Sequence, residues 1–185
     1  YLFLGPAGIG KRTFAERFGQ VLLCSGAPPE DMNPCGRCAA CQQVIAGTHA
    51  DLERVGLPKE KKFIPVETFI GDRDHRAREG FCYDLSMKPF MGGRKVGIID
   101  DADCLNEEGA NCLLKTLEEP PPKSVLILIG TSADKQLPTI RSRCQLIRFQ
   151  PLAEELVTEL LLRNEVTGER SEAERLAQVS GGGLT

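Results

Sequence analysis

The sequence lacks three features that would each assign it to a particular class of protein: a long apolar run, a secretory signal and an excess of basic residues. A membrane-spanning helix needs about 20 consecutive apolar residues, and no stretch of the sequence reaches that length. The opening residues 1–4, Tyr-Leu-Phe-Leu, indicate a buried strand and not a signal peptide. Acidic residues (26) outnumber basic residues (23), which excludes a globally basic nucleic-acid binder. We therefore expect a globular protein without membrane association.

The sequence also lacks the distributed cysteine framework of a small secreted protein, although it contains eight cysteines. Three of them crowd into residues 35–41, and most of the others lie in apolar or helical stretches. This distribution favours a reduced, cytoplasmic protein.

Strand and helix patterns alternate along the chain, which predicts an α/β fold with a mostly parallel sheet. Strands are expected over residues 1–4, 51–55, 95–101, 125–129 and 145–149. Helices are expected over residues 11–23, 65–87, 106–119, 154–163 and 171–179. Helical spacing assigns the core face of the first helix to Phe14, Phe18, Val21 and Leu22.

The expected domains are a core over residues 1–150 and a smaller helical unit over 151–185, divided at Pro151. In the smaller unit, Ser171 and Glu174 have the spacing of a capping box at a helix start. Because a strand is already in progress at residue 1 and residues 180–185 end in a glycine-rich turn, we expect the chain to be a piece of a longer protein.

The cysteine cluster has the spacing of a metal site. Cys35, Cys38 and Cys41 are each three residues apart, so their sulfurs can converge on one tetrahedral zinc ion. Cys24, at the end of the first helix, is the expected fourth ligand, and His49 is the alternative. A reactive dithiol is a second alternative. Four thiolates would close the site, which makes the zinc structural and the segment 24–41 a zinc-binding insertion.

Residues 5–11, Gly-Pro-Ala-Gly-Ile-Gly-Lys, form a candidate phosphate-binding P-loop between the first strand and the first helix. Gly5, Gly8 and Gly10 would let backbone N–H groups converge on a phosphate, and Lys11 would reach the outer phosphates. The alternative is a tight strand-to-helix turn with an incidental lysine. The loop predicts ATP as ligand.

The residue after Lys11 departs from the P-loop pattern. A serine or threonine hydroxyl is needed there to coordinate Mg²⁺, but the sequence has Arg12. Thr13 lies about 100° further around the helix and cannot simply replace that hydroxyl. The sequence therefore leaves ATP and Mg²⁺ binding in doubt.

Asp100 follows an apolar strand and suits the acidic residue that holds Mg²⁺ through water. The next position commonly carries a glutamate that orients the attacking water, but here it is Asp101, one methylene shorter. The alternative is that Asp100, Asp101 and Asp103 cap the following helix. Because both metal-handling positions depart from the pattern, we expect weak or absent ATP hydrolysis.

Taken together, the motifs resemble the bacterial DNA polymerase III clamp-loader family of the AAA+ class. The resemblance extends over nearly the whole chain and is carried by the P-loop, the cysteine insertion, residues 98–103 (Ile-Ile-Asp-Asp-Ala-Asp), residues 111–121 (Asn-Cys-Leu-Leu-Lys-Thr-Leu-Glu-Glu-Pro-Pro) and Ser142-Arg143-Cys144. It implies an AAA+ parallel sheet followed by the start of a small helical lid domain. It also implies a hetero-pentameric ring that uses ATP to open the sliding clamp and place it on primed DNA.

The resemblance also implies roles for two residues. Arg143 matches the arginine finger that reaches a neighbouring subunit's ATP, and Thr131 matches the residue that senses the γ-phosphate. The motor branch of the family, tau/gamma, carries Lys-Thr in the P-loop and Asp-Glu after the strand, so Arg12 and Asp101 favour the non-motor delta prime branch. The alternatives are an active motor ATPase, and a zinc-dependent nucleic-acid-binding module. The second is disfavoured because Arg37 is the one basic residue around the cysteines.

Overall fold

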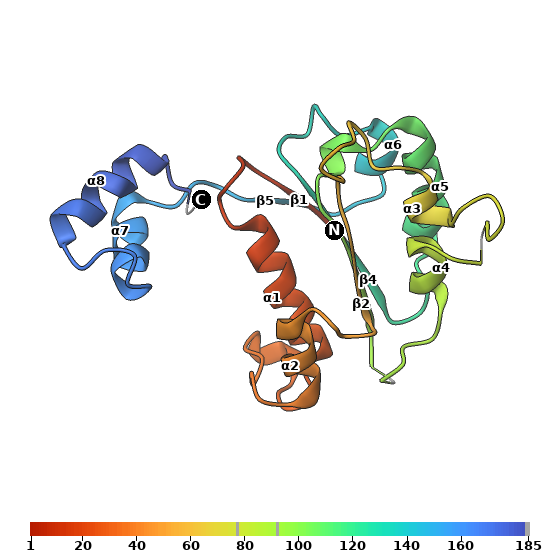
Figure 1. Ribbon diagram of the computed structural model, residues 1–185, viewed down its shortest axis with the longest axis horizontal. Coiled ribbons are helices and arrows are strands. Elements are labelled where there is room, and N and C mark those ends of the chain that lie inside the picture. Colours follow the sequence, from red (N-terminus) through yellow and green to blue (C-terminus); the bar gives the residue numbers. More distant parts are fainter. Residues whose placement is uncertain (77, 92, 184–185) are drawn as a thin grey trace.

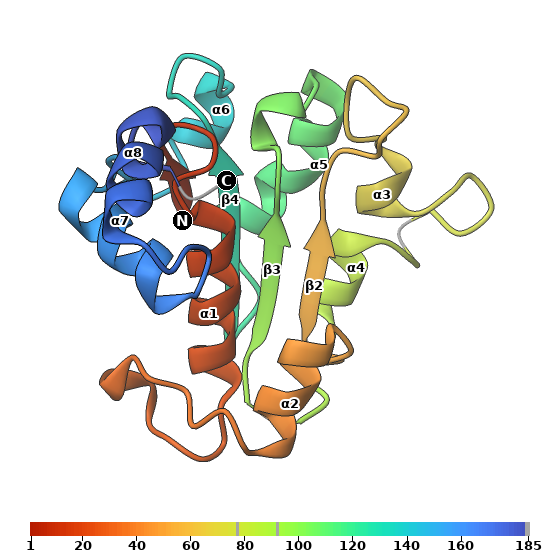
Figure 2. The same cartoon turned by 60° about the vertical axis from the view of Figure 1, so that its left-hand side comes forward.

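The computed structural model describes residues 1–76, 78–91 and 93–183. Its centre is a five-stranded sheet in the order β2-β3-β4-β1-β5, in which every adjacent pair is parallel. The strands are β1 (Leu2–Leu4), β2 (Leu52–Val55), β3 (Lys95–Ile99), β4 (Ser124–Gly130) and β5 (Leu146–Arg148). Figure 2 shows β2 and β3 running side by side in the same direction. The predicted parallel α/β fold is confirmed.

Helices cover both faces of the sheet (Figure 1). One face carries α1 (Lys11–Leu23) and α2 (Ala39–Ala46), and the other carries α3 (Glu67–Ile70), α4 (Phe81–Ser86) and α5 (Glu107–Glu118). Side chains alternate along a strand, so Phe3 joins the apolar cluster under α1, whereas Leu2 and Leu4 join the cluster under α5. Three short helices were not predicted from the sequence pattern: η1 (Pro29–Asp31), η2 (Ala102–Cys104) and α6 (Pro138–Arg141).

The prediction for the core face of α1 is confirmed for Val21, which is buried, and for Phe18 and Leu22, which pack against the apolar cluster, but it is wrong for Phe14. Phe14 is 44% exposed, and the residues that face the sheet include Ala15 and Gly19. A Cβ on Gly19 would lie 3.4 Å from Leu52 Cδ1, so the small residue lets the helix lie close to the sheet. Phe14 instead packs on Phe3, with ring centroids 5.8 Å apart. The pattern assigned the largest apolar residues to the core, but the close helix–sheet contact requires small ones.

The single helix predicted over residues 65–87 is also wrong. The structure has two short helices, α3 and α4, joined by a loop from Gly71 to Gly80. Both glycines have positive φ values, 78° and 93°, which a helix cannot contain. A Cβ on Gly80 would lie 2.6 Å from the Gly71 nitrogen, so the loop ends meet too closely for a side chain there.

The last two helices, α7 (Glu154–Arg163) and α8 (Arg170–Ser180), pack on each other and lie apart from the sheet (Figure 1). The predicted capping box is wrong, because α8 begins at Arg170 with Glu169 as its N-cap and no side-chain cap bond. The Leu152 N–H donates to the Gly182 carbonyl over 3.2 Å, which joins the segment before α7 to the turn after α8. Within the described residues, no helix is long and apolar enough to span a membrane.

A substitution at Gly97 in β3 would test how closely α4 packs against the sheet. A Cβ at this position would lie 2.6 Å from Phe81 Cζ and 3.2 Å from Leu126 Cδ1. We expect Gly97→Ala to lower the free energy of unfolding by about 1–3 kcal/mol through overpacking, measured by urea denaturation. The control is Gly93→Ala, whose Cβ would meet nothing within 4 Å. Equal stability of the two variants would contradict this packing.

Candidate nucleotide pocket and metal centre

The loop between β1 and α1 has the backbone that a P-loop requires. Gly8 and Gly10 have φ values of 79° and 86°, and Gly10 is the N-cap of α1. The loop borders a pocket of about 310 Å³ at the carboxyl edge of the sheet. Its lining brings together the predicted nucleotide residues of three sequence regions: Gly8, Gly10, Lys11, Arg12, Thr13, Asp100, Asp101 and Thr131. Gly5 lies at the other end of the loop, where a Cβ would clash with the Phe149 carbonyl oxygen at 2.5 Å.

Lys11 folds back onto its own loop. Its Nζ donates to the Gly5 carbonyl over 2.7 Å and to the Pro6 carbonyl over 2.6 Å, and the residue is 7% exposed. Burial lowers the pKa of Lys11 below its usual value, and the coulombic influence of Asp103 and Asp100 opposes this shift. A phosphate would therefore compete with two backbone carbonyls for the ammonium group.

Arg12 is ion-paired with the carboxylate predicted to hold the metal. Its Nη1 lies 3.3 Å from Asp100 Oδ2, and its Nε lies 3.3 Å from Glu16 Oε1. The Arg12 guanidinium is thus paired with the Asp100 carboxylate that would otherwise bind hydrated Mg²⁺. Arg12 and Asp100 do fit each other, but they do not form a metal site.

Asp101 and Asp103 have internal partners as well. Asp101 adopts a left-handed φ of 54°, and its Oδ2 accepts from the Leu57 N–H over 3.4 Å. Asp103 Oδ2 accepts from the backbone N–H of Thr131 over 2.9 Å and from its hydroxyl over 2.5 Å. The alternative that these aspartates cap the next helix is wrong, because the Asn106 side chain caps α5 by accepting from Gly109 N–H.

The sequence pattern did not single out the pocket residue Asp103 or its buried partner Gln136 as candidates for nucleotide binding. Asp103 received only a capping role, and Gln136, which is 4% exposed and donates to Asp103, received none. Their contacts join positions separated by 28 and 33 residues, so no local pattern could reveal them.

Arg143 does not line this pocket. It follows α6, close to the start of β5, and its Nε donates to Glu118 Oε1 over 2.7 Å. Its Nη1 donates to the Thr139 carbonyl over 3.0 Å. The hydrogen-bond partners of Arg143 are therefore different from those of the P-loop lysine, Lys11.

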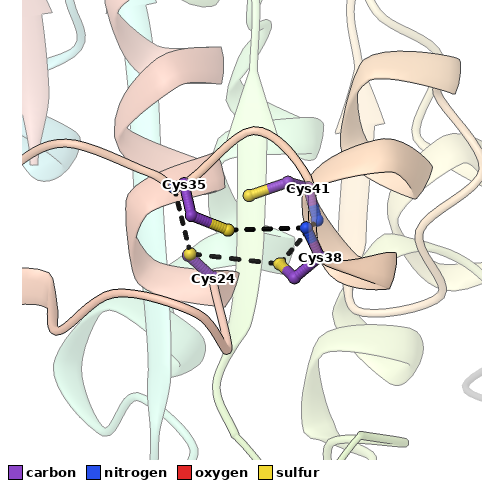
Figure 3. A group of neighbouring side chains, drawn as sticks. All are labelled: Cys24, Cys35, Cys38 and Cys41. Carbon is purple, nitrogen blue, oxygen red and sulfur yellow. Dashed lines mark hydrogen bonds between the residues drawn. The ribbon is translucent and has the colours of Figure 1, made fainter.

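The cysteine cluster forms where the end of α1 meets the start of α2 (Figure 3). The ligand atoms of Cys24, Cys35, Cys38 and Cys41 all lie within 4.8 Å of one another, and Cys24 Sγ is 4.0 Å from Cys38 Sγ. Zinc–sulfur bonds of about 2.3 Å in a tetrahedron separate sulfurs by about 3.8 Å, so the four residues fit zinc. The structure thus brings the four predicted ligands together.

Backbone N–H groups surround these sulfurs. Cys24 Sγ accepts from Gly26 N–H and Cys35 N–H, and Cys38 Sγ accepts from Cys41 N–H, each over 3.4 Å. The Cys41 N–H helps to lower the pKa of Cys38 to about 5, whereas burial raises that of Cys41. A bound cation would supply the charge that a buried Cys41 thiolate needs.

His49, the alternative ligand, lies outside this group of ligand atoms in the described part of the chain. The residue is 4% exposed, and its Nδ1 accepts from the Asp51 N–H over 3.0 Å. The four other cysteines are free and partly buried: Cys82, Cys104, Cys112 and Cys144.

The fold and the pocket are those of an α/β protein with a P-loop at the carboxyl edge of a parallel sheet. The solved structure of the Thermotoga maritima RuvB Holliday junction branch migration motor has the same fold, with a TM-score of 0.59 and 17% identity over 98% of this chain and 49% of that chain. Residues 1–153 match the family described as DNA polymerase III, delta subunit. The chain belongs to this family.

Individual relatives agree with that assignment. The DNA polymerase III subunit delta' of Pseudomonas aeruginosa is 42% identical over 144 residues, covering 78% of this chain and 40% of that protein. The delta' subunit of Escherichia coli is 34% identical, covering 86% of this chain and 44% of that protein. The tau subunit of Bacillus subtilis is 31% identical, covering 100% of this chain and 31% of that protein. The chain thus spans less than half the length of these relatives.

The metal centre predicts one zinc per chain. We expect Cys38→Ser to lose the metal and, at free zinc 1,000-fold above its dissociation constant, about 4 kcal/mol of stability. Metal analysis and thermal unfolding with and without a chelator measure both effects. Cys104→Ser, outside the cluster, is the control and should keep the zinc. A metal-free protein whose stability is unchanged by Cys38→Ser would contradict the site.

The pocket predicts that Arg12 prevents Mg²⁺-dependent nucleotide binding. We expect Arg12→Thr combined with Asp101→Glu to make ATP bind about tenfold more tightly with Mg²⁺ than with a chelator, or ~1.4 kcal/mol, because Asp100 is released and a hydroxyl is supplied. Calorimetric titration measures the affinity. Arg17→Thr changes another cation of α1 outside the pocket and should have no effect. If the double variant binds ATP as the parent does, Arg12 is not the obstacle.

Proposed function

We propose that this chain belongs to a non-motor subunit of the DNA polymerase III clamp loader. In this role it is part of a hetero-pentameric ring that loads the sliding clamp onto primed DNA as a component of the polymerase holoenzyme. Its own site hydrolyses little or no ATP, and Arg143 acts on the ATP of a neighbouring subunit. Family membership supports the assembly, and the ion pair between Arg12 and Asp100 is the observation that carries the non-motor role.

The charges around the pocket favour a non-motor role. A motor site places a hydroxyl and a carboxylate around Mg²⁺, which offsets the charge of the phosphates. Here Arg12 supplies a single positive charge and consumes the Asp100 carboxylate in an ion pair. Asp101 is shorter than glutamate and accepts a hydrogen bond from Leu57, so it is poorly placed to orient water. The motor alternative, based on tau, is therefore not favoured.

Arg143 has a position and a chemistry that suit an arginine finger. The side chain is 31% exposed and lies outside the chain's own pocket, so it is available to a neighbour. A guanidinium can make two parallel hydrogen bonds to phosphate oxygens as negative charge spreads during transfer. An arginine finger supplied by another subunit uses this chemistry.

In the same proposal, the zinc centre and the helical unit have structural roles. Four thiolates leave no open position on zinc, so the centre would brace the α1–α2 connection and not catalyse a reaction. Residues 1–150 would form the AAA+ core, and residues 151–185, with α7 and α8, would begin the helical lid domain.

Arg143→Ala tests the proposed finger in the full-length protein assembled into its ring. The neighbouring site should lose about 10³-fold or more of its hydrolysis rate, so the ATPase stimulated by clamp and primed DNA should collapse while the ring still assembles. A steady-state phosphate-release assay and size-exclusion chromatography measure the two properties. Arg141→Ala removes a nearby exposed arginine and is the matched control. Unchanged turnover in Arg143→Ala would remove the finger assignment.

A further inference from the structure

Glu118, the last residue of α5, binds the guanidinium of Arg143. The Arg143 Nε and Nη2 atoms lie 2.7 Å and 2.5 Å from the same oxygen, Glu118 Oε1. The Glu118 side chain is 51% exposed and that of Arg143 is 31% exposed, so both are open to solvent and to a partner surface.

This contact occupies the edge of the guanidinium that a phosphate would use. Two parallel N–H groups are needed for bidentate binding of a phosphate, and Nε and Nη2 form one such pair. The other edge is engaged as well, because Nη1 donates to the Thr139 carbonyl over 3.0 Å and to the Ser142 hydroxyl over 3.2 Å. Arg143 therefore cannot receive a phosphate on either edge without exchanging a partner.

The position of Glu118 is unfavourable for α5 itself. The C-terminal end of a helix carries a partial negative charge, which disfavours a carboxylate in the last turn. Glu119 adds a second carboxylate at the C-cap, directly before Pro120. Helix stability thus gives no reason for an acidic residue here, whereas the pairing with Arg143 does.

We propose that Glu118 is a positioning residue that sequesters Arg143 until the phosphates of a neighbouring subunit displace it. This inference rests on the proposed function of Arg143. A carboxylate left beside the phosphates would repel them, so Glu118 must give up the guanidinium when the finger engages. The pair is exposed and therefore weak, which makes the exchange easy.

The test uses the full-length protein in its reconstituted ring, with Glu118→Gln and Glu118→Ala as variants. Both should raise the ATPase rate without clamp and DNA by about two- to fivefold, the factor that an exposed arginine–carboxylate pair contributes. The maximal rate with clamp and primed DNA should stay unchanged. The matched control is Glu119→Gln, which removes the adjacent charge; in the described residues Glu119 forms no ion pair with Arg143.

Three results would overturn the inference. One is an unchanged unstimulated rate in both Glu118 variants, and another is an equal fall of both rates, which would show that Glu118 merely supports the local structure. The third is a rate increase that persists in Glu118→Gln combined with Arg143→Ala, because the effect would then bypass Arg143. The proposed function is judged separately by Arg143→Ala alone. Thermal unfolding and ring assembly confirm that each variant is folded.

Discussion

The parallel alignment of β1, β3 and β4 is the constraint on which the pocket depends. Leu4 pairs with Gly130, and Ile99 pairs with Leu128, so the carboxyl ends of all three strands meet at one edge. The P-loop, Asp100 and Thr131 each follow one of these strands directly. Residues separated by more than a hundred positions in the chain therefore line one cavity, and a slip in register would separate them.

Within that cavity, the groups that would handle a nucleotide already have partners in the protein. Lys11 is held by backbone carbonyls, Asp100 by Arg12, and Thr131 by Asp103. Internal pairing satisfies buried polar groups in the absence of ligand, but it makes any ligand exchange one set of contacts for another. In the proposed function, this internal pairing is the physical feature that distinguishes a non-motor subunit from a motor subunit.

Local patterns predicted the parts of the molecule that depend on neighbouring residues. The strands, the P-loop turn and the convergence of Cys35 on Cys38 follow from spacing alone, and all are present. The burial of Gly19 in place of Phe14 could not be predicted, because it depends on how close α1 lies to the sheet. The contact of Glu118 with Arg143 spans 25 residues and is fixed by where α5 ends relative to α6.

In the insertion between α1 and α2, a metal bound by the four cysteines would take the place of an apolar core. Between residues 25 and 39 the chain contributes no side chain to either apolar cluster, so burial alone cannot order this segment. Gly26 instead approaches the metal centre so closely that a Cβ there would lie 2.7 Å from Cys35 Sγ. Because Cys24 ends α1 and Cys41 lies within α2, one ion bound to both would fix the angle between two helices that lie on the same face of the sheet.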